Sequence, residues 1–235
     1  MLAKITSAAV VGLDAVPITV EVDIAAQGLP SFTIVGLPDK AVEESRERVR
    51  AALKNSGADF PAKRITVNLA PADLPKEGPA YDLPIALGIL IASGQLNTDV
   101  QNNIFLGELS LDGSVRAVWG ILPCAILAKN KGFGAIFIPI DNKNEACVIE
   151  KINIFPVKSL TELFNHFGVG PKIEKAQKPL KTNNVDEDDN DYDFANIKGQ
   201  ESAKRALTIA AAGSHNILMK GPPGAGKTLM ARSFP

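Results

Sequence analysis

Residues 221–228 read Gly221-Pro-Pro-Gly-Ala-Gly-Lys-Thr228, and this stretch decides the fold of the C-terminal part of the chain. Its glycines allow the backbone to adopt unusual angles and to approach a ligand closely. A short apolar run at residues 215–219 precedes it, and residues 229–233 follow with helical character. A buried strand, a glycine-rich loop and a helix in this order predict a P-loop in an α/β module.

A P-loop holds the phosphates of a nucleoside triphosphate with backbone N–H groups and the start of the following helix. Here the ammonium group of Lys227 would neutralise the β- and γ-phosphates, and the hydroxyl of Thr228 would bind magnesium. We therefore expect ATP and Mg²⁺ as cofactors. The predicted cofactor-binding residues are Gly221, Pro222, Pro223, Gly224, Ala225, Gly226, Lys227 and Thr228, and the predicted metal ligand is Thr228.

The segment upstream of the loop carries a second pattern. Residues 193–207 read Asp193-Phe-Ala-Asn-Ile-Lys-Gly-Gln-Glu-Ser-Ala-Lys-Arg-Ala-Leu207, and Ala210-Ala-Ala-Gly-Ser-His215 follows. This pattern resembles the entry segment of an AAA+ ATPase module, where it lines the adenine pocket. From residue 193 to residue 234 the chain is similar to the magnesium-chelatase-like AAA+ family, in particular the ComM type associated with natural transformation.

The resemblance implies a function for a full-length protein. It would be an ATPase that self-associates into a ring and moves DNA strands during recombination or uptake, so the expected partners are ATP, DNA and further copies of itself. Two alternatives stay open. One is the ATPase subunit of a magnesium chelatase that acts on a porphyrin, and the other is a non-catalytic binding or regulatory module.

These 235 residues hold only the first part of a hydrolytic site. Phosphoryl transfer needs a magnesium-binding carboxylate, an aligned water and a cation at the transition state besides the phosphate loop. No acidic Walker B segment, sensor residue or arginine finger follows Thr228 in this sequence. We expect residues 193–235 to be an incomplete AAA+ fragment with negligible ATP hydrolysis of its own, and we expect ATPase activity of the full-length parent.

Upstream of the AAA+ fragment the composition changes sharply. Four lysines are followed by six acidic residues, namely Lys172, Lys175, Lys178, Lys181, Asp186, Glu187, Asp188, Asp189, Asp191 and Asp193. A segment with so little apolar surface to bury is typical of a solvated linker, and a docking or regulatory tail is the alternative. We therefore expect a first domain at residues 1–170, a charged linker at 171–192 and the AAA+ fragment at 193–235.

The first domain mixes strand and helix patterns. Residues 16–24 alternate apolar and polar side chains, as a strand with one buried face does, and residues 31–35 and 65–69 are similar. Asp39 can cap a helix that runs to about residue 56. The other predicted elements are a buried helix at 83–93 capped by Asp82, a hairpin of 104–111 and 115–119 around Asp112-Gly113, a helix at 121–130 and a strand at 135–140. Adjacent strands with intervening helices predict an α+β domain rather than a doubly wound sheet.

Two motifs in this domain resemble the catalytic domain of Lon proteases. Leu74-Pro-Lys-Glu-Gly-Pro-Ala80 is similar to the Lon segment Pro-Lys-Asp-Gly-Pro-Ser. Leu106-Gly-Glu-Leu-Ser-Leu-Asp-Gly-Ser-Val-Arg-Ala-Val-Trp-Gly120 is similar to the hairpin that leads into the Lon catalytic-lysine helix. The resemblance implies a Lon-protease-like fold, of the ribosomal S5 domain 2-like kind, and it disfavours the chelatase alternative.

The same resemblance places Ala80 at the position of the serine nucleophile and Leu122 at that of the general-base lysine. Alanine offers no oxygen and leucine no nitrogen, so we expect no peptidase activity. Lys76 and Lys129 are charged groups nearby in the sequence, and we expect both on the surface. The domain would then serve as an assembly or binding platform.

One helix of this domain is a candidate contact for DNA. Its basic residues and those that follow it are Arg46, Arg48, Arg50, Lys54, Lys63 and Arg64. Together they could form a basic face that contacts backbone phosphates. Glu43, Glu44 and Glu47 are interleaved with them, so a solvated helix face is the favoured interpretation.

Composition limits the class of protein. A hydrophobic content of 46% is typical of a globular protein, and a net charge of −1 differs from the strong positive charge of a dedicated nucleic-acid binder. Cys124 and Cys147 lack the spacing of a zinc site or a disulfide framework. The apolar stretch at residues 83–92 is about half of the roughly 20 residues that a membrane helix needs, and the N-terminus lacks a signal-peptide pattern. We expect a cytoplasmic protein.

Overall fold

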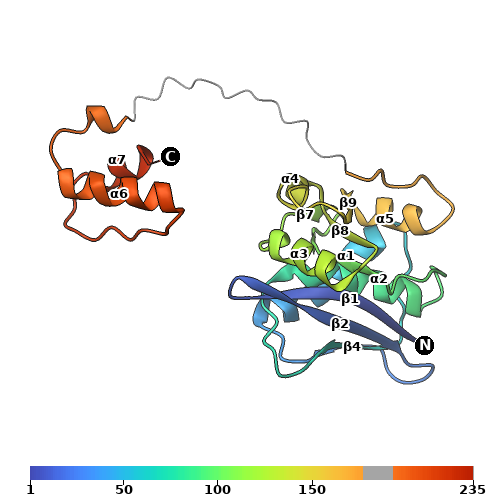
Figure 1. Ribbon diagram of the computed structural model, residues 1–235. Coiled ribbons are helices and arrows are strands. Elements are labelled where there is room, and N and C mark those ends of the chain that lie inside the picture. The colour runs from blue at the N-terminus through green and yellow to red at the C-terminus, as the bar shows by residue number, and fades with distance from the viewer. Residues whose placement is uncertain (177–192, 235) are drawn as a thin grey trace. The chain divides into compact units, whose positions relative to one another are not determined.

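The computed structural model describes residues 1–176 and 193–234. The chain divides into two compact units, unit 1 at Met1–Pro179 and unit 2 at Leu180–Pro235, and Figure 1 labels helices and strands of unit 1 and the helices α6 and α7 of unit 2. From residue 177 to residue 192 the predicted linker lies outside the described residues, so its linker character stays a prediction.

Unit 1 is built on one seven-stranded sheet with the strand order β3-β4-β2-β1-β5-β8-β9. The strands are β1 (Leu2–Val11), β2 (Asp14–Ile24), β3 (Ser31–Val35), β4 (Arg64–Ala70), β5 (Asn103–Phe105), β8 (Ala135–Pro139) and β9 (Asn153–Val157). Strand β2 pairs antiparallel with both β1 and β4, and the other four pairings are parallel. The predicted mixture of helices and strands is confirmed. More of the strand pairings in the sheet are parallel than the sequence pattern indicated.

Helices cover this sheet on both faces where β5 and β8 lie. The helices of unit 1 are α1 (Lys40–Asn55), α2 (Asp82–Ala92), α3 (Ile121–Lys131), α4 (Lys143–Ala146) and α5 (Leu160–Phe167). Phe105 and Phe137 join the core cluster that contains residues of α1, α2 and α5, whereas Ile104 and Ile136 join a second cluster with α3 and α4. This explains why every residue of β8 is apolar, since a strand covered on both faces has no polar side.

Helix α1 forms as its sequence predicts. The Asp39 side chain caps the helix by accepting a hydrogen bond from the Val42 amide at 2.7 Å, and the apolar side chains of Val42, Val49 and Leu53 are buried. Gly57 follows the helix with φ at +78°, in the left-handed region that a glycine adopts readily. The N-cap, the apolar face and the glycine after the helix could all be predicted from the sequence, because each depends on residues that are close together in the chain.

Two sequence expectations in unit 1 are wrong in detail. Helix α2 begins at Asp82, but the Asp82 side chain makes no capping hydrogen bond and is instead buried. The predicted hairpin is shorter than expected, because only β6 (Glu108–Leu109) and β7 (Val115–Arg116) pair around the turn. Gly107 interrupts the expected strand, since its amide donates to Ala80 at 2.9 Å and its carbonyl accepts from Leu83 at 3.0 Å.

Unit 2 has a small core. Its elements are a short 3₁₀ helix, η3 (Phe194–Asn196), and the helices α6 (Glu201–Gly213) and α7 (Lys227–Arg232). Ile197, Leu207 and Met230 form its buried cluster. The strand predicted at residues 215–219 is wrong: these residues form no strand, and Leu218 is 92% exposed. A strand needs a neighbour for its backbone groups, and the described residues of unit 2 contain no strand to pair with.

Candidate functional site

The glycine-rich loop of unit 2 is curved by two glycines and has open space beside it. Gly224 and Gly226 have φ values of +81° and +78°, which only glycine adopts without strain. The loop is otherwise open, because a Cβ added at Gly221, Gly224 or Gly226 would meet no atom within 4 Å. Glycine is therefore required at positions 224 and 226 by backbone conformation, and the space beside the loop is free for a ligand.

Lys227 holds its ammonium group inside the curve of this loop. Its Nζ donates to the carbonyl oxygens of Gly221 at 3.0 Å and Pro222 at 2.7 Å. Helix α7 begins at the same residue, and the first amides of a helix have no helical carbonyl to bond. Thr228, also in the first turn, is exposed. A cation, a hydroxyl and the start of a helix are thus adjacent in the chain at residues 227 and 228, a set of groups that can bind an anion and a cation.

Met230 attaches the loop to the core of unit 2. The Met230 amide donates to the Gly226 carbonyl at 3.0 Å, and its side chain is buried with Ile197 and Leu207. The segment before α6 therefore supports the loop through the core of unit 2. Sequence reasoning singled out the loop itself and missed this anchor, although an apolar residue three positions after Lys227 was a visible signal.

The positions that the Lon resemblance assigns to a catalytic pair carry only hydrocarbon side chains. Ala80 lies in the 3₁₀ helix η1 (Pro79–Tyr81) and lines a cleft of about 900 Å³. Leu122 lies in the first turn of α3, where its amide donates to Glu145 Oε1 at 2.8 Å. Neither side chain can act as a nucleophile or a base.

The two lysines singled out in the sequence differ in exposure. Lys129 is exposed at the end of α3, as expected. Lys76 is fully buried, which corrects the expectation of a surface residue, and its Nζ donates to the carbonyl oxygen of Pro71. Burial lowers the pKa of Lys76, and the nearby Asp73 carboxylate partly opposes this. Lys76 therefore satisfies its ammonium group within the fold.

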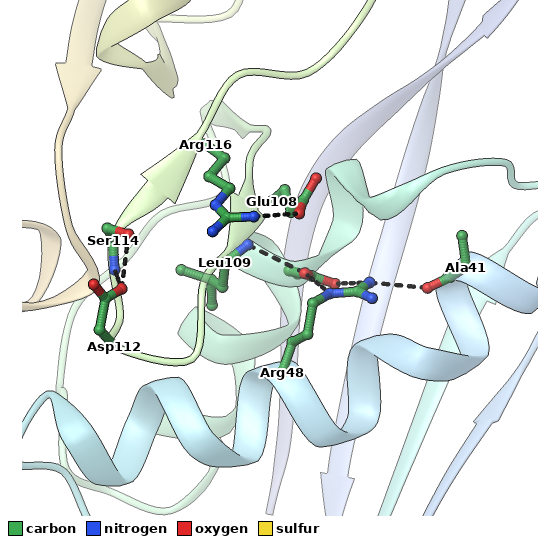
Figure 2. A network of polar contacts seen from close by, with 8 residues as sticks. Ala41, Arg48, Glu108, Leu109, Asp112, Ser114 and Arg116 are labelled. Carbon is green, nitrogen blue, oxygen red and sulfur yellow. Dashed lines mark hydrogen bonds and ion pairs between the residues drawn. The ribbon is translucent and has the colours of Figure 1, made fainter.

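One basic residue of helix α1, Arg48, does not contribute its side chain to the predicted basic face. Arg48 turns toward Asp82, which is the side chain drawn without a label in Figure 2. Its Nε and Nη2 lie 2.6 and 3.1 Å from the two carboxylate oxygens. Its Nη2 also donates to the Ala41 carbonyl at 2.9 Å, and Asp82 accepts a further hydrogen bond from the Leu109 amide at 3.1 Å. Because Arg48 and Asp82 are 34 residues apart, no local pattern could reveal this pair.

Two family models match the sequence of this chain. A model described as subunit ChlI of Mg-chelatase matches residues 20–142, which is just over half of the 235 residues. A second, described as magnesium chelatase, subunit ChlI, matches residues 193–235. The matches therefore fall on both units.

Two similar proteins match almost the whole chain, and a third matches part of it. Competence protein ComM of Haemophilus influenzae is 47% identical over 98% of this chain and 45% of its own length. The uncharacterized protein YifB of Escherichia coli K12 is 43% identical over 95% of this chain and 43% of its own length. Lon protease 2 of Bacillus subtilis is 31% identical over 58% of this chain and 24% of its own length. The chain spans about half the length of the first two relatives.

Proposed function

This chain belongs to the family of subunit ChlI of magnesium chelatase, and from that premise we propose that it binds ATP with Mg²⁺ through residues 221–228. The observation that carries the proposal is the geometry of the loop: the Lys227 ammonium lies in the curve of two left-handed glycines at the start of helix α7. Such an arrangement suits a ligand with several phosphates and does not suit a neutral one.

Each group of the loop has a separate task in this proposal. The amides at the start of α7 donate hydrogen bonds to phosphate oxygens, and Lys227 exchanges its two carbonyl partners for the more strongly accepting β- and γ-phosphates. The Thr228 hydroxyl would hold Mg²⁺, which neutralises phosphate charge when it is bound. Gly224 and Gly226 keep the backbone curved around these groups.

The test compares two lysines that lie close together. Lys227→Ala should weaken binding of a fluorescent ATP analogue by about tenfold or more, since a charged hydrogen bond contributes about 1.5–3 kcal/mol. Lys220→Ala removes an exposed lysine immediately before the loop and should leave the affinity unchanged. Equal affinities of the Lys227→Ala variant and the wild type would refute the assignment of the loop.

We further propose that the full-length protein is an AAA+ ATPase ring that acts on DNA. Similarity to a competence protein over 98% of this chain supports the DNA-acting role, and the relatives are about twice as long as the chain. The expected result is ATP hydrolysis that DNA stimulates in a protein of the relatives' length, abolished by Lys227→Ala. Hydrolysis that is insensitive to DNA would remove support for this role.

For unit 1 we propose a Lon-protease-like domain at residues 1–170 that has lost its catalytic pair and serves as a binding platform. The similarity to a Lon protease over 58% of the chain supports the fold assignment, and the side chains of Ala80 and Leu122 support the loss of peptidase chemistry. Incubation with an unfolded protein such as casein should leave the casein intact. Cleavage that survives purification to homogeneity would refute the proposal.

A second candidate function rests on the family description itself. A model named for subunit ChlI of Mg-chelatase matches residues 20–142, so an ATPase subunit that serves magnesium insertion into a porphyrin is the alternative. The two candidates predict different stimulation of ATP hydrolysis in a protein of the relatives' length. Stimulation by porphyrin with its partner subunits, and none by DNA, would favour the chelatase.

A further inference from the structure

A cavity of about 520 Å³ opens between helix α1 and the edge of the sheet in unit 1. We call it the basic notch and define it by Arg46, Arg50 and Lys54 of α1, Lys63 before β4, and the rings of Phe32 and Phe60. Strand β3, which carries Phe32, is the last strand on this side of the sheet. The notch thus lies at an open edge of unit 1, far in sequence from the phosphate loop.

Four cations line the notch, and a single carboxylate partly offsets them. Glu47 is the acidic residue of the lining, and its Oε1 lies 3.4 Å from Arg46 Nε in an exposed ion pair. An exposed pair of this kind contributes little and breaks easily in favour of a stronger anion. Arg50, Lys54 and Lys63 are exposed, so the notch concentrates positive charge in a chain whose net charge is −1.

The cations of α1 follow one another at regular intervals. Arg46, Arg50 and Lys54 are four residues apart, which places successive charges about 6 Å apart along the helix axis. Arg48, the other basic residue of this stretch, points away to Asp82 and takes no part. The row therefore suits a ligand with a linear series of negative charges better than a single compact anion.

Two aromatic rings line the notch. The Phe32 and Phe60 ring centroids lie 5.9 Å apart with a 41° angle between the planes, and both side chains are partly exposed. The Arg50 guanidinium lies 5.7 Å from the centroid of Phe60. Aromatic rings next to a row of cations are the combination that binds single-stranded nucleic acid, because bases stack on the rings while phosphates meet the cations.

We propose that the basic notch binds a single strand of nucleic acid, with its phosphates against Arg46, Arg50, Lys54 and Lys63 and one base against Phe32 and Phe60. The volume lies within the range of pockets that hold small molecules of the size of one nucleotide. The inference rests on the DNA-acting role proposed above and names the surface that would make the contact. It does not involve the ATP site.

An acidic peptide that adds a strand to the free edge of β3 is the competing occupant. Such a peptide would use backbone hydrogen bonds of β3 and would satisfy the cations with its carboxylates. It would have no use for the paired rings beside Arg50, and for that reason the geometry favours the nucleic acid. The two occupants differ in the probes that compete for the notch.

The experiment measures binding of a fluorescently labelled oligothymidylate to the 235-residue chain by anisotropy over a range of salt concentrations, without ATP. Arg50→Ala/Lys63→Ala should weaken binding at least about tenfold and lower the slope of log affinity against log salt by about 1.4, or about 0.7 per lost cation. An oligonucleotide of the same charge with abasic sites should bind the wild type about 5- to 150-fold more weakly, because it cannot stack.

The matched control is Lys129→Ala/Lys131→Ala, which removes two exposed lysines of α3 outside the notch. It should leave affinity and salt slope unchanged. Equal weakening by both double variants, or none by the notch variant, would overturn the site while leaving DNA binding intact. Undetectable binding by the wild type at low salt would overturn the inference, whereas the DNA-acting role of a protein of the relatives' length is decided separately by DNA stimulation of its ATP hydrolysis.

Two further probes decide the chemistry without any variant. Thymidylate and abasic strands that bind equally would overturn the stacking contact, and polyglutamate that competes as well as oligothymidylate would identify an acidic peptide instead. Duplex DNA of the same sequence should compete less well than the single strand, since its bases are paired and stacked within the helix.

Discussion

At the scale of single residues, Arg48 shows how one contact can reverse the role that a sequence position indicates. It lies among basic residues of an exposed helix, yet its guanidinium binds the completely buried carboxylate of Asp82 (Figure 2). Burial raises the pKa of Asp82 to about 6, and the hydrogen bonds and charge of Arg48 oppose this rise. Through Arg48, Asp82 and the Leu109 amide, the network joins α1, α2 and β6.

Replacing Arg48 with methionine should lower the free energy of unfolding by about 3–5 kcal/mol near neutral pH, because the Asp82 carboxylate is left buried without its partner. Urea denaturation measures the change. The double variant Arg48→Met/Asp82→Leu should be less destabilised than Arg48→Met, since it removes both charges and retains apolar volume. A double variant less stable than the single one would contradict this account.

The cost of Arg48→Met should also depend on pH in one direction. Without the arginine, the pKa of Asp82 in the folded state lies further above its unfolded value of 3.8, so folding takes up a proton between the two values. Below about pH 6 Asp82 is protonated in both folded proteins, so this ionisation penalty is absent, and it develops as pH rises from about 6 to the higher folded pKa of the variant. The difference in unfolding free energy between wild type and variant should therefore shrink on acidification. A difference that stays constant would show that Asp82 is not the charge responsible.

At the scale of elements, helix α2 is the centre of packing in unit 1. All of its eleven residues except Ile91 are buried, and it packs against β1 and β2 and against α1. Gly88 permits the close approach to the sheet, because a Cβ at this position would lie 2.5 Å from Val22 Cγ2. The glycine is therefore a packing requirement in the interior of a helix, where its conformational freedom is unfavourable.

The variant Gly88→Ala should lower the free energy of unfolding by about 1–3 kcal/mol, because a valine methyl group of β2 has no room to retreat. This loss exceeds the gain of up to about 1 kcal/mol that alanine brings to a helix interior. Thermal or urea denaturation measures the outcome. In a Val22→Ala background the same substitution should cost much less, since the missing methyl groups make room. Stabilisation by Gly88→Ala in the wild type would show that α2 can shift freely.

At the scale of the whole molecule, the two units differ greatly in the size of their cores. Unit 1 buries residues of its sheet and helices in two clusters, whereas the described part of unit 2 buries Ile197, Leu207 and Met230. A unit with so small a core gains little from hydrophobic burial. The glycine-rich loop is attached to this small core through Met230, so loop geometry and the stability of unit 2 are linked.

Hydrogen exchange should separate the two units. Amides of β2, β4 and α2 should exchange slowly, and amides of α6 and α7 should exchange much faster, because local opening of unit 2 exposes little apolar surface. Addition of ATP and Mg²⁺ should slow exchange in α7, since a ligand that binds the folded form stabilises it. The control is Lys227→Ala, in which the same nucleotide concentration should slow exchange much less because binding is weaker. Protection of α6 equal to that of α2 without ligand would contradict the prediction.

Features that depend on neighbours in the sequence could be predicted, and long-range pairings could not. Asp39, Val42 and Gly57 define helix α1 through a cap, an apolar face and a terminator, all within 20 residues. The strand expected at residues 215–219 failed because an apolar run becomes a strand only beside a partner. The hairpin was predicted to be too long, because Gly107 forms its hydrogen bonds with Ala80 and Leu83, which lie in a distant segment of the sequence.

The sequence alone determined which chemical groups the glycine-rich loop carries, since a lysine, a threonine and the glycines that curve the backbone are contiguous from 221 to 228. Tertiary structure decided which basic residues face solvent: it turned Arg48 inward to Asp82 and left Arg50 with Lys63 and two phenylalanines around one notch. The reason is physical. Backbone conformation and helix capping act over a few bonds, whereas charge pairing and ring contacts depend on distances in space that only the completed sheet establishes.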